Sequence, residues 1–156
     1  MKNHPATLPL VLLCLALVWL ATGCHLGKPA SASFASVVIH GKTPAQIHEA
    51  TTAVFKANEY LEQPAPEGWT FEREATQGET LSYGGLYSAR YSVATIVRVR
   101  LKLVAVGEDT QRLQCQAYMI TDARDPLMSR EIQIGNFRSE PYQQLLDEVA
   151  KRLGEP

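Results

Sequence analysis

Residues 91–107, YSVATIVRVRLKLVAVG, constrain the fold more than any other part of the chain. Apolar and cationic side chains alternate through the segment: one set is Val97, Val99, Leu101 and Leu103, and the other is Arg98, Arg100 and Lys102. Successive side chains of a β-strand point to opposite faces of the sheet. The pattern therefore predicts a long strand that buries its leucines and exposes its cations, in an antiparallel sheet with one solvated face.

Shorter segments also have the composition of strands. They are residues 34–41 (FASVVIHG), 68–75 (GWTFEREA), 111–121 (QRLQCQAYMIT) and 130–137 (REIQIGNF). In the third segment Leu113, Cys115, Ala117 and Met119 share one face, and the fourth is centred on Ile132 and Ile134. With the long strand they predict a sheet of about four to five strands.

Two segments have helical spacing. In residues 42–66, Thr43 is a predicted N-cap, Pro44 suits the first helical position, and Gln46 completes a capping box. The apolar spacing in this segment runs as far as Leu61, and the prolines at 64 and 66 are expected to end the helix. The second helix is predicted to start at Ser139 or Glu140, with Pro141 in its first turn. Its apolar stripe is Tyr142, Leu145, Leu146, Val149 and Leu153, and Gly154 is a natural stop.

The element order is strand, helix, several strands and helix. It predicts an α+β fold in which two helices cover one face of an antiparallel sheet, as a single domain over residues 37–156. The order resembles that of small uncharacterised bacterial lipoproteins. It is also loosely similar to the helix-grip fold of hydrophobic-ligand carriers, in which the sheet wraps around a longer C-terminal helix.

The start of the chain has the layout of an export signal. Lys2 precedes the uncharged stretch LPLVLLCLALVWL at residues 8–20, and small residues follow it. A membrane-spanning helix needs about 20 apolar residues. This stretch is shorter, contains Pro9 and has no basic cluster after it, so residues 1–23 are interpreted as a signal peptide.

The end of this signal, Ala21-Thr22-Gly23-Cys24, resembles the lipobox of bacterial lipoproteins, although that family prefers Leu where Ala21 stands. The resemblance implies cleavage before Cys24 and acylation of its thiol and amine with fatty acids such as palmitate. An ordinary secretory signal would be cut at the same place. Because His25 replaces the Asp that favours inner-membrane retention, the resemblance points to the outer membrane, facing the periplasm.

Residues 24–36 are then a lipidated N-terminus and a short tether, because GKPASASFAS at residues 27–36 consists mainly of small and turn-forming residues. Of 15 Lys and Arg residues Lys2 leaves with the signal, so 14 face 16 Asp and Glu residues. This balance argues against a nucleic-acid partner. Cys14 leaves with the signal and Cys24 carries lipid, so Cys115 is expected to form no intramolecular disulfide.

Two pairs of titratable residues were candidates for chemistry. His40 and His48 lack a third metal ligand nearby in the sequence and are interpreted as solvated or locally bonded. Glu72 and Glu74 share a polar strand face and are expected to pair with Arg98, Arg100 or Lys102 across strands. The chain contains no Gly-x-Ser-x-Gly motif and no phosphate-binding Gly loop. The sequence therefore predicts no catalytic residue, no metal site and no cofactor.

The segment LSYGGLYSARY at residues 81–91 is the candidate interaction surface. It carries Tyr83, Tyr87 and Tyr91 around a Gly-Gly pair. Tyrosine is enriched at binding surfaces, and paired glycines admit a close partner backbone. A connection whose tyrosines cover the rim of the core is the alternative interpretation.

The function expected from these features is non-catalytic: an envelope lipoprotein that holds or recognises a protein, lipid or cell-wall component near the membrane. A carrier of a small apolar ligand is the second hypothesis and an enzyme the third. An enclosed apolar cavity would favour the carrier, a filled core with an exposed tyrosine patch the binding module, and clustered buried titratable groups the enzyme.

Overall fold

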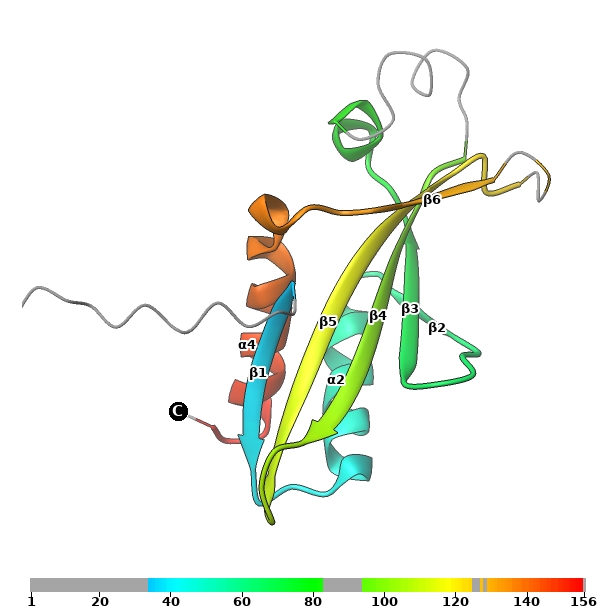
Figure 1. Ribbon diagram of the computed structural model, residues 1–156. Helices are drawn as coiled ribbons and strands as arrows, with labels where there is room; N and C mark the ends of the chain where they lie inside the picture. Colours follow the sequence, from blue (N-terminus) through cyan, green and yellow to red (C-terminus); the bar gives the residue numbers. More distant parts are fainter. Residues whose placement is uncertain (1–33, 83–93, 125–126, 128, 156) are drawn as a thin grey trace, which may run out of the picture. The chain divides into compact units, whose positions relative to one another are not determined.

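The computed structural model describes residues 34–82, 94–124, 127 and 129–155. The predicted signal, Cys24 and the three tyrosines Tyr83, Tyr87 and Tyr91 lie outside these residues. Six strands form one sheet, and Figure 1 shows helices behind it. The strands are β1 (Ala35–His40), β2 (Leu61–Gln63), β3 (Trp69–Glu74), β4 (Ile96–Ala105), β5 (Thr110–Thr121) and β6 (Arg130–Gln133).

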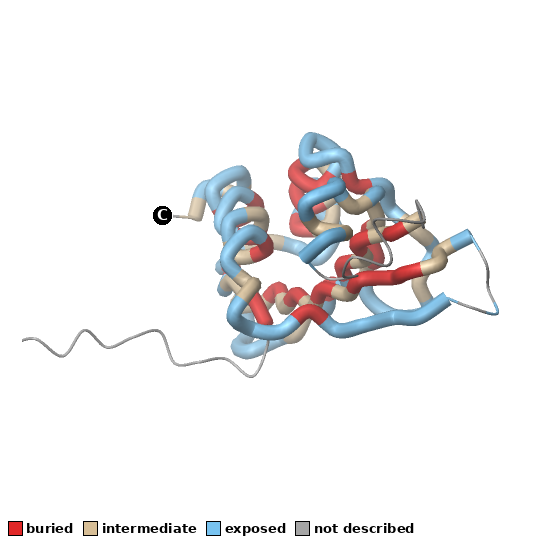
Figure 2. Tube along the Cα trace, turned by 90° about the horizontal axis from the view of Figure 1, so that it is seen from above, coloured by how far each residue is buried: buried red, intermediate tan, exposed pale blue. Residues whose placement is uncertain are grey.

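All strand pairs are antiparallel, in the order β1-β5-β4-β3-β2. The strand β6 pairs with the last residues of β5, next to the stretch that pairs with β1. Helices α2 (Pro44–Ala57) and α4 (Glu140–Arg152) lie on the same side of the sheet, as Figure 2 shows from above. A short helical segment also occupies residues 77–82, and a 3₁₀ turn, η1, spans Asn136–Arg138. The α+β class predicted from the sequence is confirmed.

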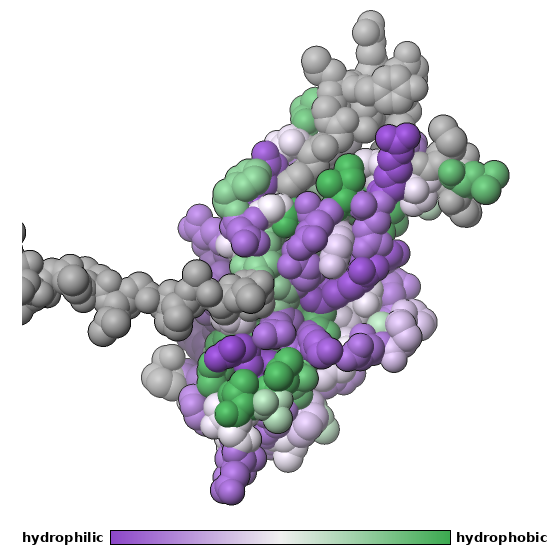
Figure 3. Space-filling view, in the orientation of Figure 1, coloured by the Kyte–Doolittle hydropathy of each residue, from purple (hydrophilic) through white to green (hydrophobic). Residues whose placement is uncertain are grey.

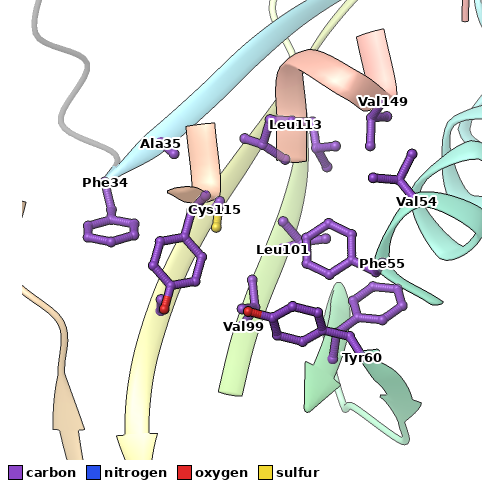
Figure 4. Packing of buried hydrophobic residues seen from close by; sticks show 14 of the residues in the cluster. Phe34, Ala35, Val54, Phe55, Tyr60, Val99, Leu101, Leu113, Cys115 and Val149 are labelled. Atoms are coloured by element: carbon purple, nitrogen blue, oxygen red, sulfur yellow. The ribbon is translucent and has the colours of Figure 1, made fainter. Parts of the chain in front are cut away.

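The hydrophobic core fills the space between the sheet and the two helices (Figure 4). The alternation in β4 is confirmed at its centre, because Val97, Val99 and Leu101 are buried while Arg100 and Lys102 are exposed; Arg98, predicted to be exposed, and Leu103, predicted to be buried, are both half-buried. The facing residues of β5 complete the apolar side of the sheet: Leu113, Cys115, Ala117 and Met119. From the helices, Ile47, Val54, Phe55, Leu146 and Val149 close the core.

The start of α2 is the predicted one. Thr43 accepts a hydrogen bond from the Gln46 backbone N–H, and Gln46 Oε1 accepts one from the Thr43 N–H, so the capping box is complete. The buried stripe of the helix is Ile47, Ala50, Thr51, Val54 and Phe55.

The predicted end of α2 is wrong. The helix stops at Ala57, and Glu59 turns the chain with φ +67°. Tyr60 rather than Leu61 is buried, with its ring 5.3 Å from the ring of Phe55. Leu61 then starts the edge strand β2, which pairs with β3. The packing of Tyr60 on Phe55 and the pairing of β2 with β3 therefore replace the last helical turn that the apolar spacing predicted.

The outer edge of β1 is closed by α4 and the residues after it. Gln143 receives a hydrogen bond from the Ser36 N–H and donates one to the Ser36 carbonyl, both at 3.1 Å. Glu155 accepts a hydrogen bond from the His40 N–H at 2.9 Å. An exposed strand edge is a template for pairing with another chain, and these side chains occupy part of it.

The first core residues lie inside the predicted tether, since Phe34 and Ala35 are buried and the Phe34 ring packs 5.2 Å from that of Tyr142. Among the described residues, the helices are too short or too polar to cross a bilayer.

Candidate functional site

The face of the sheet opposite the helices carries the charged half of the β4 alternation. In the pairing with β5, Arg98 lies opposite Tyr118, Arg100 opposite Gln116, and Lys102 opposite Gln114. Side chains of directly paired residues share a face, so all six project from this open face. Figure 3 views it and shows hydrophilic side chains gathered over its middle.

Ion pairs join three strands across this face. Arg98 donates through Nε to Glu72 on β3 and through Nη1 to Glu131 on β6, the latter at 3.0 Å. Arg100 Nη2 lies 2.8 Å from Glu131 Oε1, and its guanidinium lies 4.5 Å from the centre of the Tyr118 ring. The expected pairing of Glu72 across strands is confirmed, and Glu74 is exposed at the end of β3.

Two hollows lie on the open face, and Arg100 lines both. The first, of about 290 Å³, is lined by Glu67, Arg100, Lys102, Gln114 and Gln116 among others. The second, of about 350 Å³, is lined by the connection between β2 and β3 at residues 63–66 and by Thr70, Glu72 and Arg98. The row of cations thus lies between two concave surfaces.

The connection between β2 and β3 carries a carboxylate to the first hollow. Glu67 Oε1 accepts a hydrogen bond from Lys102 Nζ at 2.7 Å, and this bond lowers the pKa of the Glu67 carboxyl. Gly68 allows this connection to pass close to β4. Its φ is +67°, and a Cβ there would lie 2.2 Å from the Leu101 carbonyl oxygen. Only glycine accommodates both the backbone angle and the close contact with β4.

Gln116, one of the residues that line this hollow, has an unsatisfied donor. Its Nε2 atom is buried and has no hydrogen-bond partner among the described residues. An amide N–H in this state costs free energy, because its bonds to water are lost and nothing replaces them. A ligand acceptor that reached Gln116 would recover that loss.

The two histidines each bond to a carboxylate, in agreement with their interpretation as locally bonded residues. His40 Nδ1 lies 3.2 Å from Glu155 Oε2. His48 Nε2 lies 2.7 Å from Glu62 Oε1, and its ring lies 4.8 Å from that of Trp69. Within the described residues, no three His, Cys, Asp or Glu side chains form a group that could hold a metal ion.

Cys115 lies on the apolar face of β5, as predicted, and burial raises the pKa of its thiol. A buried thiol of this kind is unreactive.

A charged cluster that the sequence reasoning missed lies at the other end of the sheet. Arg73 on β3 donates two hydrogen bonds to Glu79, at 2.6 and 2.8 Å, and its guanidinium lies 5.0 Å from the Tyr60 ring centre. Burial opposes the charge of Glu79, but the hydrogen bonds from Arg73 and Thr76 outweigh it and lower the pKa of the carboxyl. Burial raises the pKa of Tyr60.

The spacing of Thr76 and Glu79 is a capping-box signal that could have located part of this cluster from the sequence. Thr76 Oγ1 accepts a hydrogen bond from the Glu79 N–H, and Glu79 Oε2 accepts one from the Thr76 N–H. Because Glu79 belongs to the short helix at residues 77–82 and Arg73 to β3, their ion pair joins the helix to the sheet. Arg73 and Glu79 bond to each other and to neighbouring groups of the same cluster, which indicates a structural role.

Comparison with known proteins adds no function. No family model matches the chain, and no curated protein matches it. Among solved structures, it is similar to the adenylate sensor from AMP-activated protein kinase, crystallised in complex with 5-aminoimidazole-4-carboxamide 1-β-D-ribofuranotide. The identity is 15%, the match covers 77% of this chain and 95% of that chain, and the TM-score is 0.41. A likeness of this level carries no argument about fold or function.

Proposed function

We propose that this chain is a lipid-anchored protein of the bacterial cell envelope whose α+β domain is a non-catalytic binding module. Residues 1–23 direct export, acylated Cys24 holds the chain in the outer membrane, and residues 24–36 tether the domain on the periplasmic side. The signal layout and the lipobox resemblance at Cys24 support the anchor. The partners are the membrane, through the lipid, and an envelope protein or cell-wall component.

One observation carries the binding role: a hollow on the open face of the sheet is lined by Gln116, whose buried amide Nε2 has no hydrogen-bond partner among the described residues. Proteins leave few buried donors unsatisfied, and an acceptor from a bound water or a ligand would satisfy this one. The other side of the sheet is covered by helices and filled with side chains, with the rings of Phe55 and Phe71 4.7 Å apart. A contact surface thus has more support than the cavity of a ligand carrier.

The charged groups on the open face favour binding over catalysis. Arg98 and Arg100 are held in ion pairs with Glu72 and Glu131, so each charge is balanced by a neighbour. Acid–base catalysis typically uses two titratable groups whose environments give them different pKa values. The tyrosine segment with Tyr83, Tyr87 and Tyr91 is retained as a proposed second contact surface.

Metabolic labelling with palmitate tests the anchor. The wild-type chain should take up label and sediment with membranes, and Cys24→Ser should do neither. If the wild type takes up no label, the proposal reduces to plain secretion.

Photo-crosslinking in cells tests the binding surface. A photoreactive phenylalanine analogue is placed at Gln114, on the open face, or at Gln144, on the exposed side of α4. The expected result is a discrete adduct from position 114 and none from position 144. The same adducts from both positions would show that the open face has no special role.

A further inference from the structure

We infer that the hollow beside Arg100 binds a carboxylate of an acidic peptide, in the place that the Glu67 side chain now occupies. The inference rests on the proposed binding role and names the ligand's chemistry. Glu67 Oε1 accepts a hydrogen bond from Lys102 Nζ at 2.7 Å at the rim of this hollow. The chain's own carboxylate thus shows which group the hollow accepts.

Four side chains that carry hydrogen-bond donors line this hollow: Arg100, Lys102, Gln114 and Gln116. Arg100 lies opposite Gln116 and Lys102 opposite Gln114, so the four side chains form a rectangle on two neighbouring strands. Directly opposed Cβ atoms lie about 5 Å apart, and residues two apart on a strand lie about 7 Å apart. A carboxylate has two acceptor oxygens and can therefore reach more than one donor at once.

Two of these donors have capacity left. Gln116 Nε2 has no partner within the described part of the chain. Arg100 bonds to Glu131 through Nη2, whereas an arginine side chain carries five N–H donors. A carboxylate between Lys102, Arg100 and Gln116 would receive charge-assisted hydrogen bonds, which are the stronger kind.

The charges on the face become complementary to an acidic ligand when Glu67 moves away. The cations of the face are Arg98, Arg100, Lys102 and, on the same face of β5, Arg112. Besides Glu67, the carboxylates that pair with them among the described residues are Glu72 and Glu131, and Glu74 lies on the same face at the end of β3. The face without Glu67 therefore carries an excess of positive charge that a carboxylate ligand would balance.

Glu67 is placed so that a ligand can displace it. Its side chain is 76% exposed and that of Lys102 is 59% exposed. Ion pairs this exposed are weak and screened by salt. Gly68 fixes the base of the connection against β4, so rotation of the Glu67 side chain is enough to vacate the position.

The second hollow favours a peptide over a small anion. It lies on the other side of Arg100 and is lined by Pro64, Thr70 and Glu72 among others. Neighbouring strands are about 4.8 Å apart, and an extended peptide advances about 3.3 Å per residue. An acidic peptide of two or three residues therefore spans from the Lys102 side of Arg100 to this second hollow.

Two variants that remove the same ion pair separate binding from folding. The full chain, purified in detergent, is titrated against a fluorescein-labelled acetyl-Ala-Glu-Ala-Glu-Ala peptide, and anisotropy reports the dissociation constant. Lys102→Gln should weaken binding about tenfold, because a charge-assisted hydrogen bond is lost. Glu67→Gln should tighten binding severalfold, because the competing carboxylate is gone.

The controls address specificity and folding. Lys151→Gln, on exposed α4, should leave the dissociation constant unchanged. A peptide with Gln in place of Glu should bind more weakly than the acidic one. Gln116→Leu removes the unpaired amide with similar side-chain volume and should weaken binding while keeping the fold, which circular dichroism checks.

Three results would overturn the inference: equal binding of the two peptides, equal effects of the Glu67 and Lys102 variants, or Lys102-dependent binding of sn-glycerol 1-phosphate without binding of the peptide. The last result would assign the face to a lipid headgroup. If the peptide fails to bind while the adduct from position 114 persists, the ligand class is wrong and the binding role stands. If both are absent, the proposed function fails as well.

Discussion

Gly68→Ala is the substitution that most directly tests how the open face is built. Gly68 has φ +67°, and an alanine Cβ would lie 2.2 Å from the Leu101 carbonyl oxygen. Carbon–oxygen contacts in proteins close to about 3.3 Å, so β3 and β4 would have to separate locally by roughly 1 Å. Left-handed backbone costs a non-glycine residue about 1–2 kcal/mol, and forced repacking about 1–3 kcal/mol. The expected loss of unfolding free energy is therefore about 2–5 kcal/mol.

Gly41→Ala is the matched control. Gly41 has φ +59°, but a Cβ there meets nothing within 4 Å. Alanine at either position lowers the entropy of the unfolded chain equally, so this effect cancels in the comparison. Urea unfolding followed by circular dichroism measures both variants. Equal losses for the two would refute the close approach of Gly68 to β4, on which the position of Glu67 depends.

Further predictions concern the core and the cluster near Arg73. Leu101→Ala should cost about 2–5 kcal/mol in urea unfolding, because Leu101 is 2% exposed, whereas Lys102→Ala should change stability by less than about 0.5 kcal/mol. Glu79→Gln should cost about 1–3 kcal/mol at pH 7, since it breaks the half-buried pair with Arg73. The folded chain lowers the pKa of Glu79, so this stabilisation is present above the unfolded value near 4.3 and is lost as the pH falls through the folded value. The free energy of unfolding should therefore fall more between pH 7 and pH 3 for the wild type than for Glu79→Gln.

Local rules account for the parts of the fold that the sequence predicted. The direction of Leu101 and Lys102 follows from the two-residue period of a strand, and the capping box at Thr43 involves residues three apart. The end of α2 followed no local rule. It depends on Tyr60 packing against Phe55 and on β2 pairing with β3, and both contacts form only when the chain has folded back.

The candidate site also has a part that the sequence predicts locally and a part that depends on the folded structure. The row of cations was visible in the sequence, because each residue belongs to one strand. The hollow was not, because it needs the register that sets Arg100 opposite Gln116 and a carboxylate 35 residues from Lys102. Strand register and the path of a connection are non-local properties. The glycine at position 68 was the one local sign, and its meaning depends on the nearness of β4.

The edges of the sheet give a reason why a partner would use the face. Peptide partners of sheet proteins often add a strand to a free edge, through main-chain hydrogen bonds. At β1 both main-chain groups of Ser36 are bonded to Gln143, and the His40 N–H is bonded to Glu155. At the other edge β2 is only three residues long, Leu61–Gln63, and short edge strands resist such pairing. The edges at β1 and β2 therefore offer a partner little free main chain, whereas the open face offers the side chains that line the hollow beside Arg100.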